Sequence, residues 1–112
     1  MNWLPLESLD SLDEVIQQSS DNSLQAIIIF KHSTRCSISA MVKSSFEREW
    51  VDNPKVPVYY LDLIKHREVS NTIADKLAVK HESPQVLVIK KGKCVYHASH
   101  NAISAGEILA KL

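Results

Sequence analysis

The chain has 112 residues, 45% of them hydrophobic, and its 13 basic and 13 acidic residues cancel to a formal net charge of zero. This length and apolar content predict one domain with one core over residues 1–112, and they exclude a disordered chain. Zero net charge provides no general attraction to nucleic acid or to an anionic membrane, so we expect neither as a partner.

The chain also lacks the signals of export and of membrane insertion. The first five residues have neither the basic start nor the apolar core of a signal peptide. The longest strongly apolar run has about five residues, whereas a membrane span needs about 20. Two cysteines do not make a disulfide framework. We therefore expect a soluble protein in the cytoplasm.

In the first half of the chain, strand-like and helical patterns alternate. A short strand is expected at residues 3–6, and a capping box that begins at Ser11 predicts a helix over 11–18. The β-branched run 24–30 is typical of a central strand covered on both faces. Apolar residues at every fourth position predict a helix over 37–50. The apolar stripe of this helix consists of Ile38, Val42, Phe46 and Trp50.

The second half continues this alternation and then ends differently. We expect a strand at 58–61, a helix at 66–77 and a strand at 86–89 that returns through a glycine-containing turn as strand 94–97. A second capping box predicts a final helix over 104–112. The order (β)αβαβαββα predicts a thioredoxin-like α/β fold, in which helices flank a mixed sheet of four or five strands.

Cys36 lies where the predicted central strand gives way to a helix, and we predict that it is the catalytic nucleophile. The free N–H groups and the dipole at a helix N-terminus favour thiolate, and the pKa of a cysteine falls at such a place beside a cation, here Arg35. The alternative is a small buried cysteine that packs as a hydrophobe. The polar flanking residues Ser33, Thr34 and Ser37 favour an exposed, reactive thiol.

The position three residues after Cys36 is Ser39, so the sequence is C-x-x-S, a one-thiol version of the redox motif C-x-x-C. The Ser39 hydroxyl lies one helical turn on and can donate to the thiolate, or it can be an ordinary first-turn serine that bonds the backbone. Thr34 and Arg35 are further candidates for stabilising the thiolate, and Arg35 can also attract carboxylates of a small thiol. Serine cannot resolve a mixed disulfide, so an outside thiol must do so.

Ser83 and Pro84 precede a predicted strand, and we predict that they bind substrate. In thioredoxin-like folds this peptide bond is cis and the residue before proline presents its backbone to the substrate. The alternative is a trans proline that starts an edge strand.

A disulfide between Cys94 and Cys36 is not expected. Pro84 should lie beside Cys36, and Cys94 lies just past the turn that follows the next strand, about 20 Å from Pro84 by strand length. Cys94 is therefore expected to be a plain strand residue.

The five histidines form no metal signature, so we expect no metal site and no tightly bound cofactor. An iron–sulfur cluster would need a dimer with extra thiols. His32 can shuttle protons or be an ordinary loop histidine, and the sequence assigns it no role.

These residues resemble a known family. The run Lys31-His32-Ser33-Thr34 followed by Cys36, Ile38 and Ser39 is similar to the K-H-S-T-x-C-P-I-S signature of the YtxJ-like monothiol bacilliredoxins of the bacillithiol system. The segments 83–85, 91–93 and 97–100 fit the same family, so the resemblance covers essentially the whole chain.

The resemblance implies a thioredoxin-like fold and a cysteine that removes bacillithiol from protein mixed disulfides. Cys36 would take up bacillithiol and free the client thiol, and a second bacillithiol or a disulfide reductase would regenerate it. The implied partners are S-thiolated client proteins, with bacillithiol as co-substrate. Two departures stand out. Ser37 replaces the usual proline and adds an N–H that can bond the thiolate, and Phe30 stands where thioredoxins carry a buried aspartate.

The sequence therefore predicts a cytoplasmic monothiol–disulfide oxidoreductase that acts through Cys36. Two alternatives stay open. One is a non-catalytic binding module that docks partners around Ser83, Pro84 and Trp50. The other is a redox sensor in which oxidised or capped Cys36 is the signal. The clients, the identity of the small thiol and the oligomeric state do not follow from the sequence.

Overall fold

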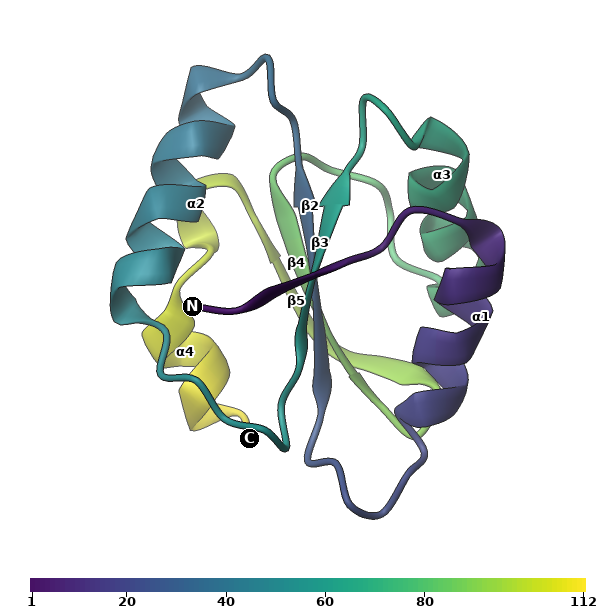
Figure 1. Ribbon diagram of the computed structural model, residues 1–112. Coiled ribbons are helices and arrows are strands. Elements are labelled where there is room, and N and C mark those ends of the chain that lie inside the picture. Colours follow the sequence, from purple (N-terminus) through teal and green to yellow (C-terminus); the bar gives the residue numbers. More distant parts are fainter.

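The computed structural model describes all residues 1–112 and is an α/β fold in which helices cover both faces of one sheet (Figure 1). The helices and strands follow the predicted order, with a short 3-10 turn before the last helix. They are β1 (Trp3–Pro5), α1 (Leu9–Gln18), β2 (Ile27–His32), α2 (Ser37–Glu49), β3 (Val58–Asp62), α3 (Arg67–Leu77), β4 (Gln85–Lys90), β5 (Lys93–Ser99), η1 (His100–Ala102) and α4 (Ala105–Ala110).

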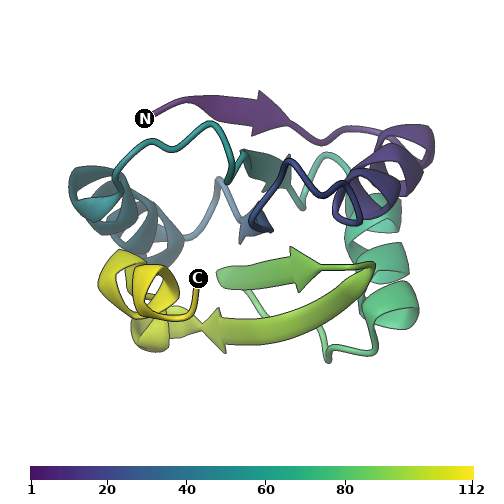
Figure 2. The same ribbon diagram turned by 90° about the horizontal axis from the view of Figure 1, so that it is seen from below.

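The sheet has five strands in the order β1-β3-β2-β4-β5. β3 runs parallel to both β1 and β2, whereas β4 runs antiparallel to β2 and β5 antiparallel to β4. Figure 2 shows β1 and β5 at the two margins of this sheet. Because β2 and β3 end where β4 begins, the segments 33–36, 63–66 and 80–84 meet at one end of the sheet, beyond the ends of these strands, which is the upper end in Figure 1.

The core consists of two apolar layers separated by the sheet. One layer lies under α1 and α3 and includes Ile27, Ile29 and Leu61, while the other lies under α2 and α4 and includes Ile28 and Phe30. All six residues of β2 are buried, so this strand is the covered central strand that its β-branched sequence predicts.

Several predicted boundaries were wrong. The N-cap of α1 is Ser8, whose hydroxyl accepts the backbone N–H of Ser11 at 3.1 Å, so the Ser–Glu pair that suggested a later start lies inside the helix. β2 begins three residues later than predicted because the two residues before it bond Lys55 instead of the ladder, and it extends to His32, which pairs with Asp62. The last helix ends at Ala110 rather than at the C-terminus.

The apolar stripe predicted for α2 was also partly wrong. Phe46 and Trp50 are buried, but Ile38 is 51% exposed and Ser39 is fully buried in its place. The reason is geometric, because each residue of a helix turns by about 100° and a four-residue repeat therefore drifts. Ile38 lies about 80° from Phe46 around the helix, whereas Ser39 lies within about 20° of it.

Replacing Phe30 by alanine should lower the free energy of unfolding by about 3–5 kcal/mol, because a fully buried ring would leave a cavity. The Phe30 ring lies 5.5 Å from the centroids of both Trp3 and Phe46, so these contacts would be lost as well. Urea unfolding followed by tryptophan fluorescence measures the change. Val95→Ala, at a 54% exposed position, is the matched control and should change the stability by less than about 0.5 kcal/mol. Equal effects of the two substitutions would contradict this account of the core.

Candidate functional site

Cys36 is the N-cap residue of α2 and is partly exposed. Its backbone is extended, its N–H donates to Ser33 O at 3.2 Å, and its carbonyl accepts the N–H of Ala40 at 3.1 Å. The first turn of α2 contains no acidic residue, so no negative side chain offsets the positive end of the helix dipole beside the sulfur. The sulfur therefore lies at the end of the sheet where the segments 33–36, 63–66 and 80–84 meet.

The residues on either side of Cys36 differ in exposure. Thr34, Arg35 and Ser37 are exposed, and Ser33 is half-buried. The segment that contains Cys36 therefore has a cationic side chain and polar groups at the surface. The roles of these side chains in stabilising a thiolate stay predictions.

Ser39 is held by two hydrogen bonds that the sequence does not reveal. Its hydroxyl accepts the backbone N–H of Ser33 at 3.1 Å and lies 2.8 Å from Nδ1 of His32. Both Ser39 and His32 are buried. The serine of the C-x-x-S motif thus connects the loop before Cys36 to the end of the central strand, and its proposed donation to the thiolate stays a prediction.

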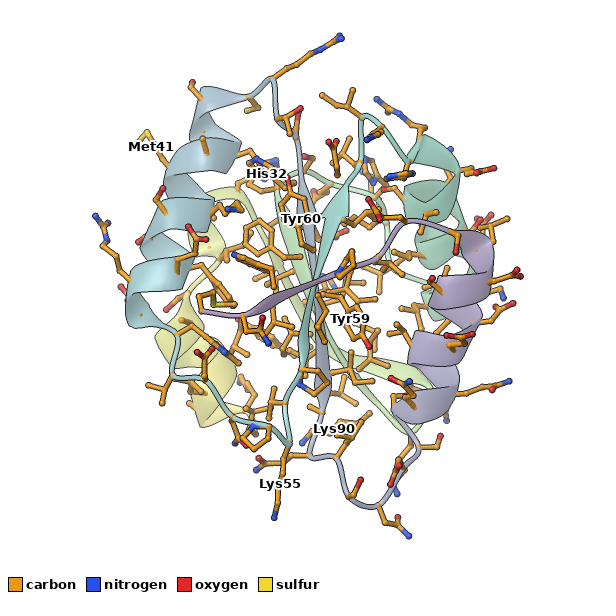
Figure 3. The ribbon with its side chains drawn as sticks, in the orientation of Figure 1. His32, Met41, Lys55, Tyr59, Tyr60 and Lys90 are labelled. Carbon is orange, nitrogen blue, oxygen red and sulfur yellow. The ribbon has the colours of Figure 1, made fainter.

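His32 is a site residue to which the sequence assigned no role. It is the last residue of β2 and lies on the face covered by α2, where its ring centroid is 5.6 Å from that of Tyr60 (Figure 3). Burial, and next the charge of Lys43, lower the pKa of His32, while Asp62 and Glu47 act in the opposite direction. The alternating positions of Ile28, Phe30 and His32 would have placed the His32 side chain on this face if the predicted strand had ended at His32 instead of Phe30.

The Ser83–Pro84 peptide bond is cis. Pro84 is buried directly before β4, and its carbonyl accepts the N–H of His100 at 3.0 Å. The Ser83 hydroxyl oxygen is buried without a protein partner. Because β4 runs antiparallel to β2, its start lies beside the end of β2, so Ser83 and Pro84 lie at the same end of the sheet as Cys36. Their role in binding substrate stays a prediction.

Lys31 is a fully buried cation on the opposite face of the sheet from His32. Its Nζ donates to the backbone oxygen of Ser70 at 3.1 Å and lies 3.3 Å from Nδ1 of His81. No carboxylate neutralises it, and burial lowers the pKa of Lys31 to about 8. The site end of the sheet therefore holds a buried amine beneath the loop that leads to Pro84.

Cys94 lies at the other end of the sheet. It pairs in β5 with Ile89, which pairs with Ile27 at the start of β2, whereas Cys36 follows the end of β2. Both cysteines are free. Burial raises the pKa of the Cys94 thiol, and its sulfur lies 3.3 Å from the backbone oxygen of Tyr96. Cys94 is therefore a strand residue, as the sequence predicts.

Trp50 is 7% exposed and packs in the core against Phe46, so it does not belong to a docking surface around Pro84, and that part of the binding-module alternative was wrong. No three His, Cys, Asp or Glu side chains are grouped closely enough to hold a metal ion. None of the helices has the length and apolarity required to span a membrane.

Comparison with known proteins agrees with the fold and with thiol chemistry. The family model of the monothiol bacilliredoxin BrxC matches residues 4–108. The solved structure of a protein assigned as a candidate oxidoreductase with a thioredoxin fold is 30% identical, with a TM-score of 0.77 over 96% of this chain and 90% of that one.

Thioredoxins themselves are more distant in sequence. The thioredoxin of Malassezia sympodialis is 17% identical, with a TM-score of 0.72 over 98% of this chain and 87% of that one. The thioredoxin of Fasciola hepatica is 19% identical, with a TM-score of 0.69 over 96% and 93%. These two structures show the shared fold, and the family match supports a thiol oxidoreductase.

The two cysteines should differ in reactivity. At pH 7.5 Cys36 should react with iodoacetamide at least about tenfold faster than Cys94, because burial raises the pKa of the Cys94 thiol whereas Cys36 lies at a helix N-terminus. Peptide mass spectrometry after timed alkylation of the native protein measures both rates. Similar rates for the two thiols would contradict the assignment of Cys36 as the reactive one.

Replacing Lys31 by methionine should stabilise the protein at pH 7.5 by about 1–3 kcal/mol, since an unpaired buried cation is removed. The folded-state pKa is about 8 and the ordinary value is 10.5, so the unfolded chain binds the proton up to a higher pH. Wild-type stability relative to Lys31→Met should therefore rise between pH 8 and 10.5. Urea unfolding of both proteins at several pH values tests this, and a constant difference across that interval would contradict it.

Proposed function

Because the chain belongs to the monothiol bacilliredoxin family, we propose that it removes bacillithiol, or a similar small thiol, from protein mixed disulfides through Cys36. The observation that carries the proposal is a partly exposed thiol at the N-terminus of α2 with serine, not cysteine, one turn later. The other cysteine lies at the far end of the sheet. The chain thus offers one nucleophile and no resolving thiol beside it.

The proposed reaction is a thiol–disulfide exchange without net oxidation. The Cys36 thiolate attacks the sulfur of the small thiol in the client's mixed disulfide, the bond between client and small thiol breaks, and the client sulfur leaves and takes a proton. Cys36 now carries the small thiol. A second small thiol, as thiolate, attacks that adduct and releases the disulfide of two small thiols together with reduced Cys36.

The surroundings of Cys36 suit this exchange. Arg35 is exposed, precedes Cys36 in the chain and can attract the carboxylates of a small thiol, while Ser83 and Pro84 lie at the same end of the sheet and can bind the client backbone. Thr34, Ser37 and Ser39 are the other candidates for stabilising the thiolate. No tightly bound cofactor is part of the proposal, and a cytoplasmic location belongs to it as a prediction.

The proposal is tested with a purified client protein that carries bacillithiol on a single cysteine. The reduced protein is added in slight excess, and intact masses of both partners are followed over time. We expect the bacillithiol mass to move from the client to this chain within minutes. Cys36→Ser should abolish the transfer and Cys94→Ser should leave it unchanged, because only Cys36 lies at the site.

Each other outcome points to a different function. If the adduct stays on the client while Cys36 remains reduced, the enzyme proposal falls and a non-catalytic binding module takes its place. If Cys36 becomes capped but a second thiol does not release the adduct, the redox-sensor function replaces it. A client carrying glutathione, tested in parallel, shows which small thiol is preferred.

A further inference from the structure

The loop that leads to Pro84 lacks backbone hydrogen bonds of its own. Pro84 is tied to His100 through its carbonyl, but no backbone N–H or carbonyl of the segment 80–83 bonds another backbone group. An irregular segment of this kind keeps one position only if side chains hold it. Because Pro84 directly follows this segment, the side chains that hold the segment also determine where the proposed client-binding residues lie.

Two buried polar side chains from neighbouring strands hold this loop. Lys31 in β2 and Gln85 in β4 are partners in the antiparallel pairing, so their side chains lie on the same face of the sheet, and both are fully buried. Gln85 Nε2 donates to the backbone oxygen of Lys80 at 3.0 Å. Lys31 Nζ lies 3.3 Å from Nδ1 of His81. Two consecutive residues of the loop are therefore each bonded to a side chain of the sheet.

The partners of the amine determine the direction of its bond to His81. The pKa of Lys31 is about 8, so at pH 7 the side chain is an ammonium, which has donors and no acceptor. One donor bonds the backbone oxygen of Ser70 at 3.1 Å. Nδ1 of His81 must then accept from Lys31, which places the imidazole proton on Nε2.

The other groups around His81 agree with this neutral form. The Ser70 hydroxyl, from α3, lies 3.1 Å from Nδ1 and can donate to it as well. Burial, followed by the charges of Lys31 in β2 and Arg67 in α3, lowers the pKa of His81, while Glu82 in the loop acts in the opposite direction. The imidazole is therefore an uncharged acceptor at pH 7.

A buried ammonium without a counter-ion destabilises the folded protein, so its contacts need a reason. Lys31 joins three parts of the chain: β2, which carries it, α3 through Ser70, and the loop through His81. An apolar side chain of similar length would fill the same space and would join none of them. Locally unfavourable groups are typical of functional sites, and this one lies at the end of the sheet that holds Cys36.

We propose that Lys31 and His81 are positioning residues for the client: the ammonium donates to Nδ1, and this bond holds the loop that leads to Pro84. Neither residue is catalytic, since Lys31 is fully buried on the opposite face of the sheet from α2. The inference rests on the proposed function, because it concerns how the client named there is bound.

The first test is NMR of the full ¹⁵N-labelled chain at pH 7. Nδ1 of His81 should give the signal of a bare nitrogen. The backbone order parameters of residues 81–83 should be near about 0.85 in the wild type and fall toward the flexible range, below about 0.6, in Lys31→Met. The turn at 91–92, at the other end of the sheet, is the internal control and should not change. A protonated Nδ1, or an equally rigid loop in both proteins, overturns the proposal.

Variants of His81 separate the hydrogen bond from the size of the side chain. His81→Asn places an amide oxygen near the position of Nδ1 and keeps an acceptor, whereas His81→Leu removes it. The loop should stay rigid in the first variant and become flexible in the second, and equal behaviour of the two would contradict the proposal. Lys76→Met, which removes an exposed lysine of α3 paired with Asp13, is the matched control and should leave the loop rigid.

Transfer of bacillithiol from a client protein provides the functional measurement. In Lys31→Met and His81→Leu the KM for the client should rise about fivefold or more, while the maximal rate changes by less than about twofold. Alkylation of Cys36 by iodoacetamide needs no client and should be unchanged in both variants. An unchanged KM overturns the proposal. If the wild type transfers no adduct, the proposed function falls, and the NMR measurement still decides whether this bond holds the loop.

Discussion

The structure depends on the complete burial of β2 between two neighbouring strands and two helical layers. β2 pairs in parallel with β3 and antiparallel with β4, and all six of its residues are buried. This arrangement fixes where the strand ends, and the end of the strand fixes where α2 begins. A cysteine four residues beyond His32 is therefore held at a helix N-terminus by the most buried part of the molecule, while its sulfur remains reachable from solvent.

The burial of β2 also encloses two polar side chains, which have different partners on the two faces of the sheet. Lys31 and His32 are adjacent, so their side chains point to opposite faces. Lys31 finds only a backbone carbonyl and a histidine nitrogen under α3, which leaves a cation without a counter-ion. His32 finds the hydroxyl of Ser39 under α2, which connects it to the first turn of the helix that carries Cys36.

A one-thiol site raises the question of what the serine of C-x-x-S is for. It cannot resolve a mixed disulfide, so its hydrogen bonds are what it contributes. In the resting structure these bonds go to Ser33 and His32. The serine thus holds the loop before Cys36 and connects that loop to a titratable group, and both hydrogen bonds would be lost with an apolar residue of similar size.

The sequence by itself determined the order of elements, the central strand, the place of Cys36 between that strand and a helix, and the serine three residues after it, because these follow from local periodicity and from residue identity. Only the tertiary structure decided that His32 belongs to β2 and that Ser39 takes the buried place predicted for Ile38. The first depends on how far β3 extends beside β2, and the second on the 3.6-residue turn of a helix docked on a sheet. Contacts between residues distant in space, such as Lys31 with His81, carry no signal in the local pattern of either segment.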